Sequence, residues 1–466
     1  MPDCTNIIVE PVFAAEDGLT LSILLYLDEA KDFRERYKLE LLQCVLTRSG
    51  ARVDVVDRSR AIDDTLLRAY HEVWFFLTSR NADEQLTDAE CFALRDWMDH
   101  GGGVLITGDH ADVNANGKFV GLGRPIGARI PRARHMREWD AAPGVRRDLG
   151  SINTTEISAG RDIAPQLLEQ DATPQRLLLP TEVDGEPHAI FLDAQGRLLD
   201  RLPDHRHEGK VLDTVKKPVG EPEIPAHIDE WQGSDLKVKI VARGIDWLRG
   251  DCSNLMAVWD GHQVRSRKGA EGEWLVCGRI LADSSWHHYV DYNIAAIAAT
   301  GEGVWNDWAK LKALYVNIAA WLAPLAVRRA YRARACRWVG EHPDYAFRGT
   351  DRQMGATALP LLASRLPGAW LHNMSAELLA EHGAAKSVET MPADFGEVLI
   401  GGFMRRFMSG GTQEPLLQQV WQSPEERALK PDAPDLVTET IAAYEDEWRI
   451  EHKGWQNFCK VVQERR

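Results

Sequence analysis

The sequence predicts an α/β fold centred on a doubly wound parallel sheet. Two observations support this prediction. Short, nearly continuous apolar runs, typical of strands buried on both faces, occur along the N-terminal part of the chain. Amphipathic helical stretches alternate with them over short links. The 466 residues allow about two or three domains, and a content of 44% hydrophobic and 27% charged residues excludes wholesale disorder.

Five apolar runs are expected to be the strands of this sheet: residues 21–27, 53–56, 73–77, 104–107 and 274–282. A helix with an apolar side that includes Tyr37 and Leu41 should follow the first strand and end at Gly50, a C-cap glycine. A second helix should begin at Thr87, which has capping-box spacing to Glu90, and end at the glycines 101–103.

The periodicity changes beyond residue 140. Short strands and a Pro-, charge- and His-rich loop are expected there, followed by a long amphipathic helix that ends near Pro324 and by further helices. We therefore predict an α/β core formed by residues 1–139 and 272–325. Residues 140–271 would be a β-rich insertion, and residues 326–466 an appended, mainly helical C-terminal domain.

Charge and cysteine content restrict the environment and the partners. The net charge of −15 disfavours nucleic acid and anionic membranes as partners. The seven cysteines include no CxxC pair, which favours reduced thiols over a disulfide framework. Neither a membrane span nor a signal segment is evident. We expect a cytoplasmic protein with a small-molecule substrate, and the sequence is compatible with a homo-oligomer.

Polar residues follow several predicted strands, at the edge where open parallel sheets bind ligands. Asp28 follows the first strand, and a turn with imidazole and carboxylate groups follows both the fourth and the last. The candidate catalytic residues are Asp109, His110, Glu208 and His288. The candidate metal ligands are His110, His207 and His287, for zinc, manganese or iron. The alternative is a set of loop histidines that form hydrogen bonds or face solvent.

We expect His110, His207 and one of His287 and His288 to meet in one cleft. His287 is favoured as the inward group, because successive side chains of an extended segment point to opposite faces. Asp28 is a candidate substrate ligand, although a polar strand-to-helix link is an equal alternative.

Arg124 and Arg129 belong to a local basic cluster that would bind an anionic substrate, or else form ion pairs with the acidic surface. The arginines at 328–337 fit a solvated or domain-contacting helix face better than a nucleic-acid site. The chain has no GxSxG elbow, and neither GxGxxG nor GxxxxGK[ST] follows the first strand. No nucleotide cofactor is therefore expected.

Several segments resemble the class I glutamine amidotransferase-like superfamily, and more narrowly its ThuA-like (trehalose-utilisation) branch. These segments are Val73–Leu77, Leu86–Glu90, Trp97–His110, Asp204–Gly209 and Asp283–His288. The resemblance covers about residues 20–325 and implies a flavodoxin-like core. The turn that would hold the family's nucleophilic cysteine is Gly108-Asp109-His110 in this chain, so cysteine-dependent glutamine hydrolysis is not expected.

Two hypotheses follow from these observations. In the first, the chain is a hydrolase or lyase that acts on a small polar or anionic, possibly carbohydrate-like, metabolite. A bound metal would activate water, or a histidine would act as general base. In the second, it is a non-catalytic amidotransferase-like module for binding or assembly, whose helical C-terminal region contacts the partner.

Overall fold

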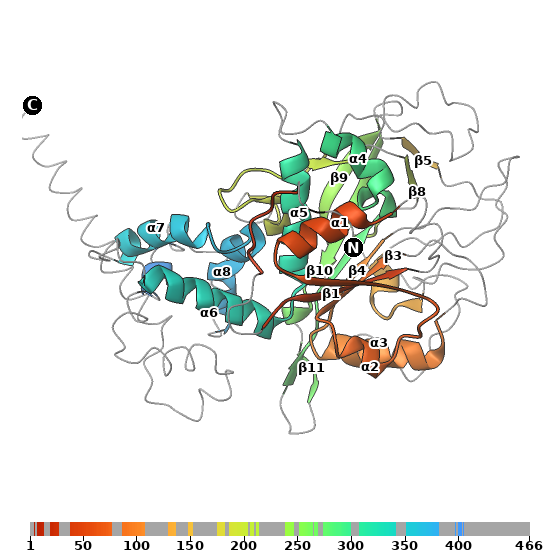
Figure 1. Cartoon of the computed structure of the whole chain (residues 1–466), viewed down its shortest axis with the longest axis horizontal. Helices are drawn as coiled ribbons and strands as arrows, with labels where there is room; N and C mark the ends of the chain where they lie inside the picture. Colours follow the sequence, from red (N-terminus) through yellow and green to blue (C-terminus); the bar gives the residue numbers. More distant parts are fainter. Residues whose placement is uncertain are drawn as a thin grey trace, which may run out of the picture. The chain divides into compact units, whose positions relative to one another are not determined.

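A computed structural model shows an α/β protein with a central seven-stranded sheet in the order β2-β1-β3-β4-β13-β10-β9 (Figure 1). The structure describes residues 4, 7–13, 19–27, 38–76, 86–107, 129–136, 148–151, 175–181, 186–203, 206–208, 211–213, 238–246, 251–263, 265–268, 274–299, 307–341, 351–381, 397, 399–402 and 404.

The first four predicted strands are confirmed to within a residue or so at each end. They are β1 (Ser22–Leu27), β2 (Arg52–Asp57), β3 (Glu72–Phe76) and β4 (Gly103–Ile106). All four pair in parallel, with β1 between β2 and β3. Every residue of β1, β3 and β4 is buried, which explains why these strands read as continuous apolar runs.

The fifth predicted strand, 274–282, is not a single strand. Its first part is β12 (Trp274–Val276), which pairs with β11 (Arg265–Lys268) in a separate sheet. Its second part is β13 (Ile280–Asp283), which pairs in parallel with β4 as expected. Gly278 lies at the break. A Cβ there would lie 1.9 Å from the carbonyl oxygen of Gly102, so only glycine fits this close approach of two backbones.

Two strands of the predicted insertion extend the central sheet. β10 (Asp251–Trp259) pairs antiparallel with β13, and β9 (Lys239–Asp246) pairs antiparallel with β10. The remaining described strands are short antiparallel pairs: β5 (Asp148–Ser151) with β8 (Arg206–Glu208), and β6 (Gln175–Arg176) with β7 (Arg201–Leu202).

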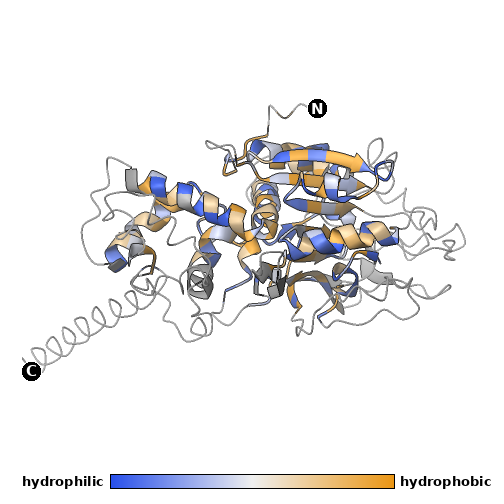
Figure 2. Ribbon diagram, turned by 90° about the horizontal axis from the view of Figure 1, so that it is seen from below, coloured by the Kyte–Doolittle hydropathy of each residue, from blue (hydrophilic) through white to orange (hydrophobic). Residues whose placement is uncertain are grey.

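Helices cover both faces of the sheet. α1 (Glu40–Arg48), α4 (Asp291–Ala299) and α5 (Asp307–Leu322) contact one another on one face. α2 (Asp64–Leu67) and α3 (Asp88–Asp99) lie together on the other (Figure 1). Figure 2 shows helices of mixed hydropathy beside strands rich in hydrophobic residues, as this layering requires.

The local signals that predicted the helix ends are confirmed. Gly50 and Gly101 follow α1 and α3 with φ of 96° and 97°, the left-handed conformation of a glycine C-cap. Thr87 and Glu90 form the complete capping box at the start of α3. α2 was not predicted; it is a single helical turn whose N-cap, Asp63, accepts a hydrogen bond from the backbone N–H of Leu66.

The chain divides into two compact units. The first comprises residues 1–181, 190–193 and 197–328, and the second comprises 182–189, 194–196 and 329–466. Three further helices follow α5: α6 (Leu325–Glu341), α7 (Asp351–Leu362) and α8 (Gly368–Glu381). The mainly helical character of residues 326–466 as a whole stays a prediction, since most of the chain beyond residue 381 lies outside the described residues.

The expectation that all cysteines are reduced is wrong for one pair. Cys4 and Cys44 form a disulfide across a sequence separation of 40 residues, which no motif spacing indicated. Cys91, Cys252, Cys277 and Cys336, the other cysteines that the structure describes, are not in disulfides. Among the residues that the structure describes, no single helix is both long and apolar enough to span a membrane; α5 and α6 meet that test only when counted together as a bent pair.

Candidate functional site

The candidate site begins where β13 ends, at the carboxyl edge of the parallel strands. Asp283 is the last residue of β13, and a short 3₁₀ turn, η9 (Trp286–His288), follows almost at once. Two polar contacts fix this turn. The backbone N–H of Ser285 donates to the carboxylate of Asp283 at 3.1 Å, and the hydroxyl of Ser285 accepts from the backbone N–H of His287 at 3.2 Å. Ser285 is thus the N-cap of the turn.

A carboxylate–imidazole pair is the central feature of the site. Nδ1 of His288 lies 2.8 and 2.9 Å from the two carboxylate oxygens of Asp283, and both side chains are fully buried. A carboxylate in this position accepts the Nδ1–H and so fixes the tautomer of the ring. Any acid–base or ligand role of His288 therefore belongs to Nε2.

Two buried tyrosines hold the pair in place. The hydroxyl of Tyr289 donates to Asp283 at 2.8 Å, and the hydroxyl of Tyr315, on α5, donates to the backbone carbonyl of His288. Burial and the charge of Asp283 raise the pKa of both hydroxyls well above the ordinary value. Both tyrosines therefore remain neutral hydrogen-bond donors at any physiological pH.

The Tyr289 ring contacts Trp74 and Phe76 of β3, with centroid distances of 6.1 and 5.7 Å. Both contacts are edge-to-face, a favourable geometry for aromatic rings. These residues lie on the face of the sheet that α1, α4 and α5 cover. The pair therefore sits between the end of β13 and the helical layer, supported by packing as well as by hydrogen bonds.

The preference for His287 as the histidine that faces the cleft stays a prediction, but the two adjacent histidines differ in burial. His288 is the fully buried one, whereas His287 is half-buried. The turn η9 is the physical reason, because a 3₁₀ turn replaces the alternation of an extended segment. The His287 ring stacks on Trp286 at 3.7 Å, and its Nδ1 lies 3.1 Å from the side-chain oxygen of Asn293.

The convergence of histidines from three segments stays a prediction. Asp28, Asp109, His110 and Arg124 lie outside the described residues. For His207 and Glu208 the structure gives the backbone position only, in β8, where Glu208 pairs with Asp148 of β5. Among the described residues, His288 lies against Asp283, and the half-buried His287 is its neighbour in the turn η9.

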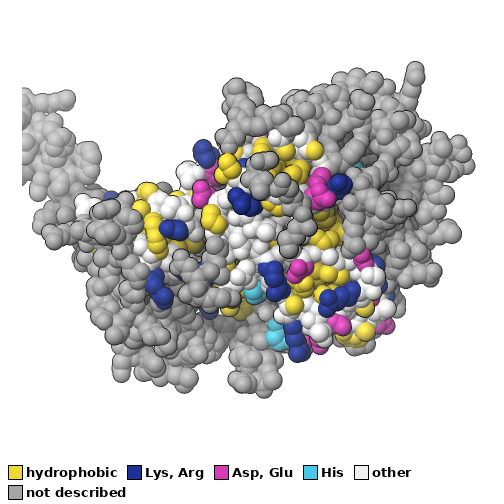
Figure 3. All heavy atoms as spheres, in the orientation of Figure 1, with side chains coloured by type: hydrophobic (Ala, Val, Ile, Leu, Met, Phe, Trp, Pro, Cys, Tyr) yellow, Lys and Arg dark blue, Asp and Glu magenta, His cyan; other side chains and the backbone are white. Residues whose placement is uncertain are grey.

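Arg129 of the predicted basic cluster, and the nearby Arg132, form ion pairs with acidic side chains of the protein itself. Arg129 donates to Asp88 at 2.6 Å and to the carbonyl of Leu86, with 12% of its side chain exposed. Arg132 is buried and pairs with Asp99 at 2.5 Å. For both, the structure thus shows the ion-pair alternative. Charged side chains of both signs also lie near one another on the described part of the face in Figure 3.

No group of three or more metal-ligating side chains is present in the described part of the chain, which omits His110 and the side chain of His207. Sequence reasoning named His288 and missed its partners Asp283, Tyr289 and Tyr315. A signal for Asp283 existed, because it directly follows the predicted strand 274–282 and begins the same polar segment as His288. Tyr315 carried none, since its position in an apolar helix pattern predicts only burial.

The chain was compared with protein-family models, with curated proteins and with solved structures. No family model and no curated protein matches the chain. Among solved structures, the chain is similar to one described as "mmIFT52 N-terminal domain", with 13% sequence identity and a TM-score of 0.33, over 64% of this chain and 96% of that one.

Proposed function

We propose that the chain is a hydrolase or lyase acting on a small polar or anionic metabolite, with His288 as its acid–base group. The observation that carries this proposal is the Asp283–His288 pair at the carboxyl end of a parallel strand. In open α/β sheets ligands bind outside the carboxyl ends of the strands. A buried carboxylate on Nδ1 is the arrangement that prepares the opposite ring nitrogen to take or give a proton.

The proposed chemistry uses the contacts of this pair. Asp283 would stabilise the imidazolium that forms when Nε2 of His288 accepts a proton from water or substrate. Tyr289 would hold the carboxylate in place through the described hydrogen bond. Asp109 and His110 follow β4, the neighbour of β13, and we propose that they face the same edge.

The order of the parallel strands supports a more specific fold than the general α/β class. The five parallel strands run in the order β2-β1-β3-β4-β13, which is the flavodoxin-like order. This order supports the resemblance to the amidotransferase-like superfamily and its ThuA-like branch. We propose such a core, with a partly β-rich insertion and a helical C-terminal region.

A divalent metal is compatible with the described residues. Metal-bound histidines usually donate their second ring N–H to a carboxylate, as His288 does to Asp283. With a metal bound, Nε2 of His288 would be a ligand in place of its acid–base role, together with His287, His110 and His207, and a bound metal with an open position would supply an activated water at neutral pH. Elemental analysis of untagged protein, before and after substitution of both His287 and His288, tests this part.

The experiment that tests the proposal compares His288→Gln with His100→Gln in a substrate panel. The panel contains aryl esters, aryl phosphates, aryl glycosides and small lactones. His100 is a half-exposed histidine beyond the end of α3 and serves as the matched control. We expect the wild type and His100→Gln to convert at least one class, and His288→Gln to be slower by about 100-fold or more. Equal rates in His288→Gln and the wild type would disprove the acid–base role.

One observation favours the second function, a non-catalytic binding or assembly module. Neither Asp283 nor His288 exposes any of its side chain, and a fully buried polar pair also serves to fix a turn. If this function holds, His288→Gln loses folding stability while no panel compound is converted by any variant. Retained stability together with lost turnover supports the enzyme instead.

A further inference from the structure

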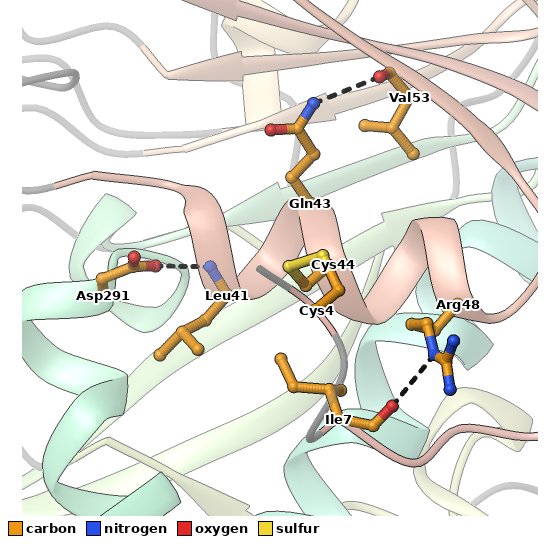
Figure 4. Close-up of a disulfide and its surroundings, with 8 residues drawn as sticks. All are labelled: Cys4, Ile7, Leu41, Gln43, Cys44, Arg48, Val53 and Asp291. Carbon is orange, nitrogen blue, oxygen red and sulfur yellow. Dashed lines mark hydrogen bonds between the residues drawn. A yellow bond between two sulfur atoms is a disulfide. The ribbon is translucent and has the colours of Figure 1, made fainter. Parts of the chain in front are cut away.

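The disulfide attaches the N-terminal segment to the helical layer of the first unit. Cys4 precedes the sheet in sequence, and Cys44 lies in the middle of α1, where it is buried (Figure 4). We call residues 4 and 7–13 the N-terminal strap. Cys4 is half-buried and Cys44 is buried, so Cys4 is the more exposed residue of the pair.

Beyond the disulfide, hydrogen bonds hold the strap along the helices. Arg48 at the end of α1 donates to the carbonyl of Ile7 at 3.1 Å, and Lys312 of α5 donates to the carbonyl of Ile8 at 2.7 Å. Phe13 is fully buried, and its backbone N–H donates to the carbonyl of Ser49. The strap therefore bridges α1 and α5, with the disulfide as its one covalent contact to either helix.

The same two helices support the Asp283–His288 pair. At the start of α1, the backbone N–H of Leu41 donates to the carboxylate of Asp291 at 2.8 Å, and the N–H of Asp291 donates to the carbonyl of Lys38. Asp291 is three residues beyond His288 and begins α4. Tyr315, which holds the His288 carbonyl, belongs to α5. A loosened α1 would thus lose contacts with the segment that contains η9.

We propose that Cys4–Cys44 is a redox-sensitive clasp whose reduction loosens the strap, α1 and the polar turn from Ser284 to Asp291. The reductant is a dithiol of the thioredoxin class. Its thiolate attacks the sulfur of Cys4, and Cys44 leaves as a thiolate and takes a proton. The second thiol of the reductant then displaces Cys4, so two electrons pass to the protein and the reductant becomes the disulfide. Oxidation by a disulfide of the same class reverses both steps.

The other described thiols are poor competitors for this exchange. Cys91, Cys277 and Cys336 are buried. Burial raises the pKa of Cys91 to about 11 and that of Cys336 to about 12, so little thiolate forms at neutral pH. Cys252 is exposed and is replaced by serine in the experiment, to prevent reshuffling.

Hydrogen exchange measured by mass spectrometry tests the clasp, and it does not depend on any activity. The full-length Cys252→Ser protein is compared after oxidation with oxidised glutathione and after reduction with dithiothreitol, together with a Cys4→Ser, Cys252→Ser double variant. We expect exchange in the strap, in α1 and in residues 284–299 to become about tenfold faster or more upon reduction. The double variant should match the reduced protein under both conditions. α3, on the opposite face of the sheet, is the internal control and should not change.

Two results would overturn the proposal. One is a thiol count showing that Cys4 and Cys44 stay reduced after oxidation. The other is a formed disulfide whose reduction leaves exchange in α1 and residues 284–299 unchanged. Because the readout is exchange, loss of the proposed enzymatic function would leave this result standing, and the reverse also holds.

Discussion

At the residue scale, Glu72 is an unusual group for the start of a central strand. Its side chain is fully buried, and one carboxyl oxygen accepts a hydrogen bond from the indole N–H of Trp74 at 2.9 Å. The other oxygen has no hydrogen-bond partner in the part of the chain that the structure describes. Burial raises the pKa of Glu72 well above its ordinary value, so this carboxyl holds its proton to higher pH in the folded protein than in the unfolded chain.

The raised pKa of Glu72 makes the free energy of unfolding depend on pH. The folded pKa exceeds the unfolded one, so the contribution of Glu72 is complete below about pH 4.5 and is lost as the pH rises toward the folded pKa. Glu72→Gln removes the titration and retains an oxygen for Trp74. In urea unfolding near pH 8, we expect the free energy of unfolding of Glu72→Gln to exceed that of the wild type by about 1 kcal/mol or more. Near pH 5 the two proteins should have similar free energies of unfolding.

Glu90 is a second buried glutamate, and its pKa is shifted in the opposite direction to that of Glu72. Burial raises its pKa, but hydrogen bonds from Arg58 and from the backbone of Ile62 and Thr87 outweigh burial and lower it. Its contribution is therefore present at neutral pH and lost as the pH falls through the folded pKa. Glu90→Gln should lower the free energy of unfolding near pH 7 by about 1–3 kcal/mol. If Glu72→Gln also destabilised the protein near pH 8, the raised pKa of Glu72 would be refuted.

At the scale of elements, the first turn of α1 depends on a residue 250 positions away. The N-cap position of α1 is Leu39, which has no side-chain acceptor, and Asp291 supplies one to the N–H of Leu41. Burial raises the pKa of Asp291 to about 6, and the charge of Glu40 adds to this, although the backbone hydrogen bonds oppose it. The link between α1 and α4 is therefore sensitive to pH.

The sign of this dependence follows from the raised pKa. The stabilising contribution of protonated Asp291 is complete below about pH 4 and is lost as the pH rises to about 6. Asp291→Asn still offers an oxygen to Leu41, so we expect it to remove this slope from the pH profile of unfolding. Asp291→Ala removes the same slope and also the acceptor for Leu41, so it should be less stable than Asp291→Asn by about 1 kcal/mol at every pH, as expected for a lost helix cap. A profile for Asp291→Asn that parallels the wild type between pH 4 and 6 would contradict the assignment.

The elements predicted correctly are those whose signals are local. Buried runs define β1, β3 and β4, and the capping box of Thr87 and the left-handed glycines at 50 and 101 mark helix ends. The failures involve long-range contacts. The break at Gly278 depends on the backbone of Gly102, and the pairing of β10 with β13 depends on contacts that no periodicity encodes.

At the scale of the whole molecule, the candidate site was predictable only in part. The sheet edge and His288 followed from the rule that parallel strands end at a common edge. The burial of His288 depends on the turn η9, and the Cys4–Cys44 disulfide depends on a pairing across 40 residues. Both features depend on tertiary contacts, which local sequence patterns do not encode. The segments expected to supply His110 and His207 remain the untested part of the prediction.

The two compact units predict two unfolding transitions in differential scanning calorimetry. Trp370 is buried in the second unit, where its ring lies 5.2 Å from that of Tyr331, and Leu105 is buried in β4 of the first unit. Trp370→Ala should cost about 3–5 kcal/mol and Leu105→Ala about 2–5 kcal/mol. Each substitution should lower the Tm of its own unit by about 5 °C or more and leave the other transition in place. A single transition that both substitutions lower equally would show that the units unfold together.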